Sequence, residues 1–389
     1  MASIEAVRPL CAELAEIRRD LHAHPELGFE EQRTAALVAA NLKSWGIEVH
    51  EGVGGTGVVG VLKHGNGAGA VGLRCDMDAL AMQEASGVAH ASTSPGRMHG
   101  CGHDGHTAML LGTARYLSLH HSFNGTVNFI FQPAEEGRCG AEAMLRDGLF
   151  TRFPCDSVWG MHNRPGLPVG HFAIRPGPAM AGAAFFDIRI TGKGSHGARP
   201  EASVDPVLVA AQLTCALQSV VSRNVPPAET AVLSVTRIAA GDAYNVIPQA
   251  ATLWGTARSP SMATMTMMEE SMKRLAAGVA AGFGATAEVD FRFLFRPLVN
   301  VPALADAMAD AAAAVAGPQA VDRMGPLNNA SEDFSAMLEV VPGAMINIGN
   351  GASAELHNPA FDFNDEAIPY GVAFWATLVE RQLPQSVME

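Results

Sequence analysis

Apolar runs of strand length alternate with helical segments over the first 160 or so residues, and this alternation limits the possible folds more than any other feature. Helices are expected wherever apolar residues recur every three to four positions. The predicted strands cover 57–62, 71–75, 126–131 and 157–161, and the predicted helices cover 4–21, 34–45, 107–117 and 141–145. Alternating strands and helices indicate an α/β domain with a mostly parallel sheet.

The pattern changes after Pro176-Gly177-Pro178 and changes back after Pro297. Between these points it predicts strands at 185–190, 231–238, 251–258 and 287–293 and helices at 206–221 and 263–283. This β-α-β-β-α-β order suits a separate, ferredoxin-like α+β domain. A helix at 303–315 and a strand at 344–348 then resume the first pattern. We therefore predict a discontinuous larger domain, residues 1–179 and 295–389, with a smaller α+β domain, residues 180–294, inserted into it.

Composition excludes several classes of partner. A formal charge of −13 argues against nucleic acid and anionic membrane surfaces. No apolar run approaches the roughly 20 residues of a membrane span, and no signal-peptide pattern is present. The six cysteines are scattered, unlike those of a secreted disulfide scaffold. These features predict a cytoplasmic protein with no nucleic-acid or membrane partner.

The stretch 98–106, Met-His-Gly-Cys-Gly-His-Asp-Gly-His, gathers one thiol, three imidazoles and one carboxylate. Cysteine and histidine suit borderline divalent metals, and the glycines let the backbone approach an ion closely. These side chains could instead be buried core residues, or the turn could hold a phosphate at a helix N-terminus. The phosphate alternative is weaker because the stretch lacks both the Gly-x-Gly-x-x-Gly pattern and a lysine. A metal site is favoured if the rest of the chain supplies further ligands.

Polar clusters follow three of the predicted strands, at 76–78, 132–137 and 162–163. In such sheets ligands bind beyond the carboxyl ends of the strands, so the clusters predict a site there. The candidate metal ligands are Cys101, His103, Glu136, His162 and His357. Five ligands suit two ions that share ligands. Their spread along the chain favours an open catalytic site over a closed Cys/His zinc site.

The adjacent Glu135 and Glu136 predict two different roles. Neighbouring side chains point in opposite directions in extended backbone, so one carboxylate can bind metal while the other does not. The second carboxylate can then take a proton from an attacking water and deliver it to a leaving amine. The alternative is a solvated surface pair. The position directly after an apolar strand and Gln132-Pro133 argues against that alternative.

Ordered motifs along nearly the whole chain carry a family resemblance. They lie at 19–31, 76–80, 99–106, 132–137, 160–162, 192–200, 245–248, 331–334 and 356–359. With these motifs the chain resembles the metallopeptidase-related amidohydrolase family that includes hippurate hydrolase, N-acyl-amino-acid amidohydrolases and plant auxin-conjugate hydrolases. Two positions depart from the usual pattern, Cys75 and Ala81. They leave the substrate preference open. His22 and His24 belong to a family motif but receive no role.

The resemblance implies a role for each candidate residue. It implies Cys101, His103, Glu136, His162 and His357 as ligands of a two-metal site, Glu135 as general base and acid, and Asp78 as the residue that orients a ligand. It also implies that His196 polarises the scissile carbonyl and that Asn245 and Arg258 bind the substrate carboxylate, which a guanidinium can meet bidentately. Ordinary surface or turn chemistry is the alternative for these last three residues.

The implied activity is metal-dependent hydrolysis of the amide bond of small N-acyl amino acids, hippurate-like or N-acetylated. Two divalent ions per subunit, Mn, Zn, Co or Ni, are the implied cofactors. The inserted domain is expected to act as a lid and to form a homodimer or homotetramer. Three alternatives remain: an aminopeptidase, dipeptidase or other small-amide hydrolase of the same fold; a hydrolase with Cys101 as nucleophile beside His103 or His106; and a metal-dependent binding protein without catalysis.

Overall fold

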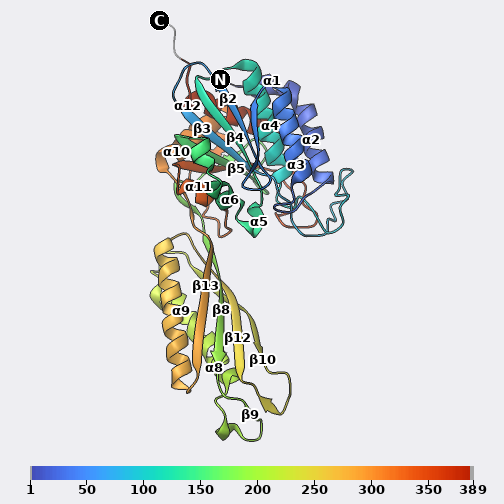
Figure 1. Cartoon of the computed structure of the whole chain (residues 1–389). Coiled ribbons are helices and arrows are strands. Elements are labelled where there is room, and N and C mark those ends of the chain that lie inside the picture. The colour runs from blue at the N-terminus through green and yellow to red at the C-terminus, as the bar shows by residue number, and fades with distance from the viewer. Residues whose placement is uncertain (1, 386–389) are drawn as a thin grey trace. The chain divides into compact units, whose positions relative to one another are not determined.

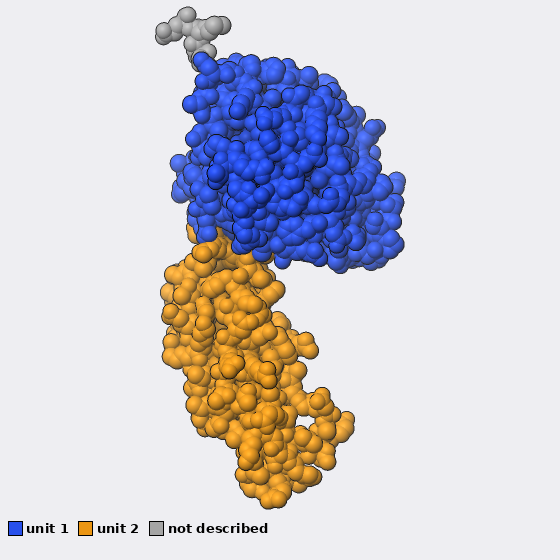
Figure 2. Space-filling view, in the orientation of Figure 1, with its two compact units in different colours: residues 1–177, 299–326, 333–389 blue, residues 178–298, 327–332 orange. Residues whose placement is uncertain are grey.

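The computed structural model describes residues 2–385 and divides the chain into two compact units (Figures 1 and 2). Unit 1 comprises the residues up to Gly177, Val299–Pro326 and the residues from Asp333 onward, and unit 2 comprises Pro178–Leu298 and Leu327–Glu332. The segment Leu327–Glu332 was assigned to the larger domain by the sequence pattern. Each unit has its own apolar core, so each is described by itself.

An eight-stranded mixed sheet forms the centre of unit 1. Its order is β1-β2-β4-β3-β5-β16-β6-β15. The strands are β1 (Glu48–Val53), β2 (Gly57–His64), β3 (Ala70–Asp76), β4 (Gly125–Gln132), β5 (Ser157–Arg164), β6 (Phe172–Ala173), β15 (Val321–Asp322) and β16 (Gly343–Gly349). The central four, β4-β3-β5-β16, are parallel, and they are buried and largely apolar, as expected for strands covered on both faces.

Helices cover both faces of this sheet. They are α1 (Ile4–Val7), α2 (Cys11–Ala23), α3 (Gln32–Ser44), α4 (His103–His120), α5 (Glu135–Arg138), α6 (Gly140–Arg146), α7 (Leu149–Arg152), α10 (Pro302–Ala316), α11 (Phe334–Leu338) and α12 (Ile368–Gln382), with 3-10 turns at Arg8–Leu10, Pro318–Ala320 and Asp365–Ala367. On β5, Gly160 faces Phe334 of α11 while Met161 faces Gly371 of α12. Successive strand residues point to opposite faces, so α11 and α12 lie on opposite sides.

Most predicted elements of unit 1 are present within a few residues of their expected bounds. The single helix predicted at 4–21 is wrong, because Pro9 lies in a 3-10 turn that separates α1 from α2. Strands β1, β6 and β15 had no clear apolar pattern; β1 is polar and the other two are very short. Within residues 2–385, no helix is long and apolar enough to cross a membrane.

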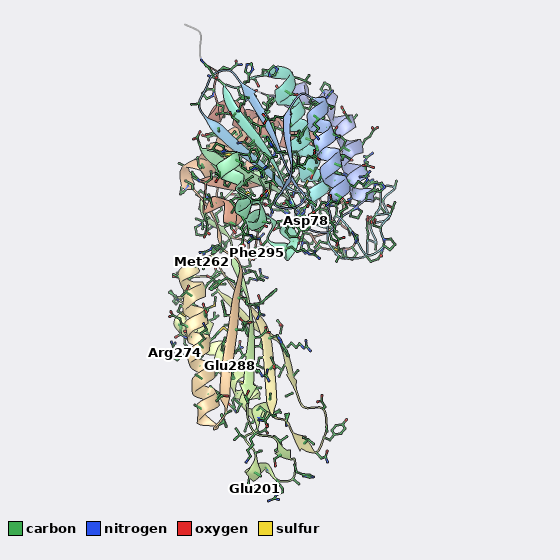
Figure 3. The ribbon with its side chains drawn as sticks, in the orientation of Figure 1. Asp78, Glu201, Met262, Arg274, Glu288 and Phe295 are labelled. Atoms are coloured by element: carbon green, nitrogen blue, oxygen red, sulfur yellow. The ribbon has the colours of Figure 1, made fainter. Side chains whose placement is uncertain are left out.

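Unit 2 has the predicted β-α-β-β-α-β order. Its elements are β8 (Gly182–Thr191), α8 (Pro206–Asn224), β10 (Val232–Ala240), β12 (Ala250–Ser259), α9 (Met262–Gly282) and β13 (Thr286–Phe295), with a 3-10 turn at Pro200–Ala202. The sheet order β10-β12-β8-β13 is antiparallel throughout. Figure 3 labels Met262 and Arg274 on α9 and Glu288 on β13.

Local sequence explains the start of both helices of unit 2. Oδ1 of Asp205 accepts from the N–H of Val207 at the start of α8, and Oγ of Ser261 accepts from the N–H of Thr264 at the start of α9. A second small pairing joins β9 (Ser195–His196) to β11 (Val246–Ile247). The short strands β7 (Gly177–Met180) and β14 (Leu298–Asn300) lie in the sequence where the chain passes between units.

Candidate metal centre

Two predicted ligands come from the loop that opens α4. Cys101 is buried in this loop, and His103 is the first residue of the helix. Gly102 between them has φ +87°, and the amide of Asn163 occupies the place where a Cβ would lie. Only glycine meets both conditions without strain. The glycine therefore lets the chain turn sharply between the thiol of Cys101 and the imidazole of His103.

The rings of His103 and His162 both present Nε2 to the site. Nδ1 of His103 lies 2.8 Å from the carbonyl oxygen of Asp78, and Nδ1 of His162 lies 2.7 Å from that of Asn163. A carbonyl only accepts, so each Nδ1 carries a proton and each Nε2 is left for the site. Oδ2 of Asp76 lies 3.7 Å from Nε2 of His103, and this carboxylate outweighs burial and raises the pKa of that ring well above its ordinary value, so an ion at Nε2 would take the place of a proton. Burial lowers the pKa of His162 to about 3, which keeps that ring neutral. This is the tautomer in which histidine binds metals.

The other three predicted ligands meet these rings. Sγ of Cys101 lies 3.4 Å from Nε2 of His162, and Nε2 of His357 lies 3.2 Å from Oε1 of Glu136. Possible ligand atoms of Cys101, Glu136 and His357 all lie within 4.8 Å of one another. The backbone of His357 has φ +62°, and its N–H donates to the carbonyl of Gly100 at 2.8 Å. Such strained backbone is concentrated at functional sites.

This donor set fits divalent metal ions. Nε2 of His103 is buried and has no hydrogen-bond partner among residues 2–385, a situation that costs free energy unless a further group binds there. Ligand atoms of His103, Glu135 and Glu136 form a second group within 4.8 Å, so Glu136 is common to both groups. One thiol, three imidazoles and a carboxylate match the preferences of borderline transition metals.

Asp78, which Figure 3 labels in unit 1, fixes the turn that carries the two glutamates. Its Oδ1 accepts from the N–H of Glu135 at 3.0 Å, and its Oδ2 accepts from the N–H of Glu136 at 2.9 Å. The preceding Ala134 has φ +54°, so the chain turns sharply just after β4. Glu135 is buried, and its Oε1 accepts from the N–H of Asp333 at 3.4 Å. The two glutamates lie in the short helix α5 and not in extended backbone, so the expectation that they point in opposite directions is wrong; oxygens of both lie within 4.8 Å of each other and of a ring nitrogen of His103.

Buried charged residues next to the proposed ligands form a network of ion pairs that we did not predict from the sequence. Nη1 of Arg74 lies 2.9 Å from Oδ2 of Asp76, and its Nη2 lies 3.2 Å from Oδ1 of Asp333. Oδ1 of Asp76 lies 2.6 Å from Nδ1 of His106. Nε2 of His106 accepts from the N–H of Asn163 at 2.9 Å. Both nitrogens of His106 are therefore occupied, although its atoms, with Asp76, could also belong to a metal-binding group.

Part of this charge network is visible in the sequence. Asp76 and Asp78 both follow the strand predicted at 71–75, but the sequence analysis predicts a role for Asp78 alone. The choice between His103 and His106, three residues apart, depends on the tertiary contact with Asn163.

His196, Asn245 and Arg258 lie in unit 2, apart in sequence and fold from the residues of unit 1. His196 pairs with Val246, and the N–H of Gly197 donates to the carbonyl of Asn245 at 2.7 Å, so His196 and Asn245 are neighbours. Nη1 of Arg258 donates to Oγ of Ser331. Burial lowers the pKa of Arg258 from its ordinary value.

Within unit 2 these residues do not converge. Asn245 lies beyond the end of the sheet where Ala250 pairs with Thr191, whereas Arg258 pairs with Ala183 at the other end. At about 3.3 Å per residue, Ala250 and Arg258 lie roughly 26 Å apart along β12. Within one copy of unit 2, Asn245 and Arg258 are therefore far apart compared with the size of a small substrate.

Comparison with known proteins identifies the family. The family model described as peptidase family M20/M25/M40 matches residues 72–381. Hippurate hydrolase from Campylobacter jejuni is 39% identical over 383 residues, covering 98% of this chain and 100% of that protein. N-acetylcysteine deacetylase from Bacillus subtilis is 40% identical over 367 residues, covering 94% and 95%.

A solved structure agrees with the sequence comparisons. A Bacillus subtilis protein described as a dinuclear metal binding peptidase from the M20 family superimposes with a TM-score of 0.86 at 34% identity. The alignment covers 97% of this chain and 99% of that one. The resemblance found in the sequence motifs is thereby confirmed, together with the α/β fold class. The chain belongs to peptidase family M20/M25/M40 and is one of its metal-dependent amidohydrolases.

Proposed function

We propose that this enzyme hydrolyses the amide bond of N-acyl amino acids, with two divalent metal ions held by Cys101, His103, Glu136, His162 and His357. One observation carries the proposal: two imidazoles, each held by a carbonyl at Nδ1, direct Nε2 toward a thiol and the Glu136 carboxylate beside a second buried carboxylate, Glu135. A closed structural metal site has no need of that second carboxylate.

Bound divalent ions supply Lewis acidity, which favours ionisation of water and polarises a carbonyl oxygen. Mn, Zn, Co and Ni all suit this combination of sulfur, nitrogen and oxygen ligands. Asp78 holds the backbone of both glutamates through its two carboxylate oxygens and contacts His103 at 3.4 Å. It therefore orients ligands without occupying a ligand position.

Glu135 is the general base and acid in this proposal. It receives the proton of the attacking water and then delivers it to the amide nitrogen that leaves as an amine. The N–H of Asp333 donates to Oε1 of Glu135, and the backbone N–H of Glu135 donates to the carboxylate of Asp78. Because both the backbone and the side chain of Glu135 are held by hydrogen bonds, the carboxylate needs little movement to reach the position in which it accepts a proton.

Two relatives and three side chains support the proposed substrate class. Hippurate and N-acetylcysteine, which name two relatives, are both N-acyl amino acids with a free carboxylate. Arg258 and Asn245 are the proposed carboxylate ligands, and His196 donates to the carbonyl oxygen as negative charge develops. His196 and its neighbour Asn245 lie toward one end of the sheet of unit 2 and Arg258 toward the other, so we assign Arg258 to one copy of the chain and His196 with Asn245 to another copy in a homodimer or homotetramer.

A Cys101 nucleophile is less consistent with the site. Burial raises the pKa of the Cys101 thiol, and the carboxylate of Glu136 raises it further. A nucleophilic cysteine normally has a lowered pKa. Sulfur in this environment becomes a thiolate most readily by binding a metal.

A panel of hydrolysis assays tests the proposal. Metal-free enzyme is reconstituted with Mn, Zn or Co and given hippurate, N-acetyl amino acids and unblocked dipeptides, with Glu135→Gln in parallel. We expect metal to restore hydrolysis of N-acyl substrates and Glu135→Gln to lower kcat by about 10²–10⁴-fold while ions still bind. Faster hydrolysis of unblocked dipeptides would instead identify a dipeptidase. Activity that survives chelation would contradict the two-metal mechanism.

A further inference from the structure

A second charge cluster, centred on α2, lies outside the residues proposed for the reaction. His22, which is fully buried, has a carboxylate at each ring nitrogen: Oδ2 of Asp104 lies 2.8 Å from Nδ1, and Oε1 of Glu84 lies 3.2 Å from Nε2. An ionised carboxylate only accepts hydrogen bonds, so both nitrogens carry protons and the ring is a cation. Asp104 directly follows His103 in the first turn of α4.

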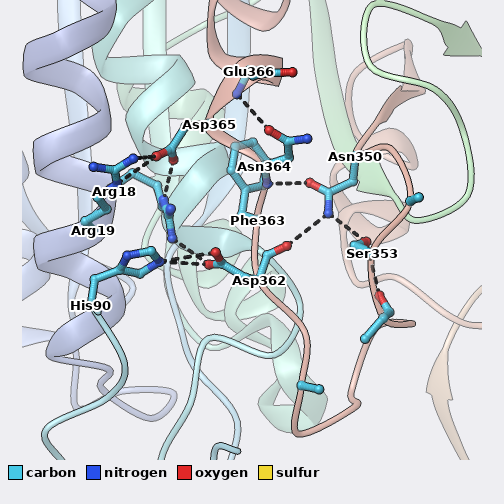
Figure 4. Close-up of a pocket in the computed structure, with 13 residues that line it drawn as sticks. Arg18, Arg19, His90, Asn350, Ser353, Asp362, Phe363, Asn364, Asp365 and Glu366 are labelled. Atoms are coloured by element: carbon cyan, nitrogen blue, oxygen red, sulfur yellow. Dashed lines mark hydrogen bonds and ion pairs between the residues drawn. The ribbon is translucent and has the colours of Figure 1, made fainter. Parts of the chain in front are cut away.

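Arg18 lies one turn earlier on the same helix and is 1% exposed. Its Nε lies 2.7 Å from Oδ1 of Asp365, and its Nη1 lies 2.8 Å from Oδ1 of Asp362 and 3.6 Å from Oδ2 of Asp104. Figure 4 shows the guanidinium between Asp362 and Asp365, at a cavity of about 470 Å³. Both aspartates follow His357 in the connection between β16 and α12.

We propose that Arg18 and His22 are positioning residues for the metal centre, because they fasten the segment with His103 and the segment after His357 to one helix. This inference rests on the proposed function, which makes His103 and His357 ligands. Neither cation reaches the site itself. They act through Asp104, Asp362 and Asp365, and so add to the hydrogen bond from the N–H of His357 to the carbonyl of Gly100 that already joins the two segments.

The chain contains matched controls on the same stretch. Arg19 also pairs with Asp365, at 2.7 Å, but its side chain is 52% exposed, and exposed ion pairs contribute little. His24 is likewise part exposed, and its Nδ1 lies 2.8 Å from the carbonyl of Asp20 on the same helix. Leu14 packs from α2 against Gly112 of α4 without touching the charge cluster. Leu14→Ala therefore loosens the same helix pair while the ion pairs remain.

The experiment measures metal affinity and thermal stability separately. Metal-free full-length variants are titrated with Mn²⁺ and with Zn²⁺, and their melting temperatures are recorded. We expect Arg18→Met and His22→Gln to bind at least one ion about 10–100-fold more weakly, as is usual when groups that orient ligands are lost. Arg19→Met, His24→Gln and Leu14→Ala should bind within about threefold of wild type, although Leu14→Ala melts earlier.

Two results would overturn the inference. One is that Arg18→Met and His22→Gln bind both ions as the wild type does. The other is that Leu14→Ala weakens binding equally, which would make the effect one of general stability. Where Arg18→Met does not fold, Arg18→Lys decides instead, since it keeps the charge but cannot contact both Asp362 and Asp365 in the same way.

A second measurement separates this inference from the proposed function. If the wild type binds neither ion, the proposed function fails, and amide hydrogen exchange in the metal-free chain then tests the positioning role alone. Faster exchange at 103–106 and 356–358 in His22→Gln than in His24→Gln supports it. Equal exchange in the two variants contradicts it.

Discussion

The carboxylate of Asp78 accepts a 2.9 Å hydrogen bond from the backbone N–H of Glu136. The other carboxylate oxygen of Asp78 accepts from the N–H of Glu135. One side chain just after β3 therefore holds the turn that follows β4. The two strands are parallel neighbours, and their ends meet at the same edge of the sheet. Strand register therefore sets the position of the glutamates.

Replacing Asp78 by Asn should weaken metal binding by about 10–100-fold, because an amide group cannot accept from both N–H groups. Activity at limiting metal should fall in parallel. Asp156→Asn is the control, since Asp156 also accepts from a backbone N–H, that of Ala70, but at the opposite end of β3. Metal titration of both variants checks the prediction; equal affinities would contradict it.

Cys101→Ser should lower metal affinity and activity together, because a hydroxyl is a much weaker ligand than a thiolate for borderline metals. Cys155 is the matched control, since its thiol lies beside Asn128, away from the proposed ligands. Metal content and turnover of Cys101→Ser and Cys155→Ser provide the comparison. Loss of turnover in Cys101→Ser with full metal content would instead support a nucleophilic cysteine.

Mixing two inactive variants should restore activity if each site uses two copies of the chain. Glu135→Gln lacks the base, and His196→Ala lacks the donor from unit 2. A mixed dimer then contains one site with both residues intact, so about a quarter of wild-type activity is expected after random exchange of subunits. The assay is turnover before and after subunit exchange. Absence of recovery, with exchange confirmed by mass spectrometry, would place His196 and Glu135 in the same copy.

Folding stability should depend on pH through His22. Burial alone lowers the pKa of this ring, but Asp104 and Glu84 outweigh burial and raise it from 6.5 to about 9. The stabilisation is therefore complete below about pH 6.5 and is lost as pH rises through about 9, for a change of about 3 kcal/mol. Denaturant unfolding of wild type and His22→Gln at pH 6 and pH 10 tests this. The stability difference between them should shrink at high pH, and a constant difference would contradict the prediction.

The fold could largely be predicted because the apolar periodicity of this chain is strong. The buried strands from Val58 to Leu62 and from Val127 to Phe131 have no competing interpretation as loops. Strand β1 lacked such a signal, since its residues Glu48, His50 and Glu51 are polar and partly exposed at a sheet edge. The break at Pro9 was visible in the sequence, but the apolar spacing around it continued without interruption.

The candidate site could be predicted as far as its motifs are local. Glu135 and Glu136 were visible as polar residues after a buried strand, and Cys101 and His103 as a loop of possible ligands. Arg18 and His22 could not receive a role, because their partners Asp104 and Asp362 lie far away in the sequence. No local pattern indicates which distant carboxylate a buried cation will meet.

The five proposed ligands extend from position 101 to position 357, and this spread ties metal capture to completion of the fold. Cys101 and His103 lie in the N-terminal part of the chain, which the ribosome makes first. All five ligands come together only after β16, the last strand of the central sheet, has paired with β5. Ions that bind only this finished arrangement stabilise it by mass action, by about 2.7 kcal/mol at a hundredfold excess over Kd. Metal supply in the cell thus becomes a determinant of how long the finished enzyme survives.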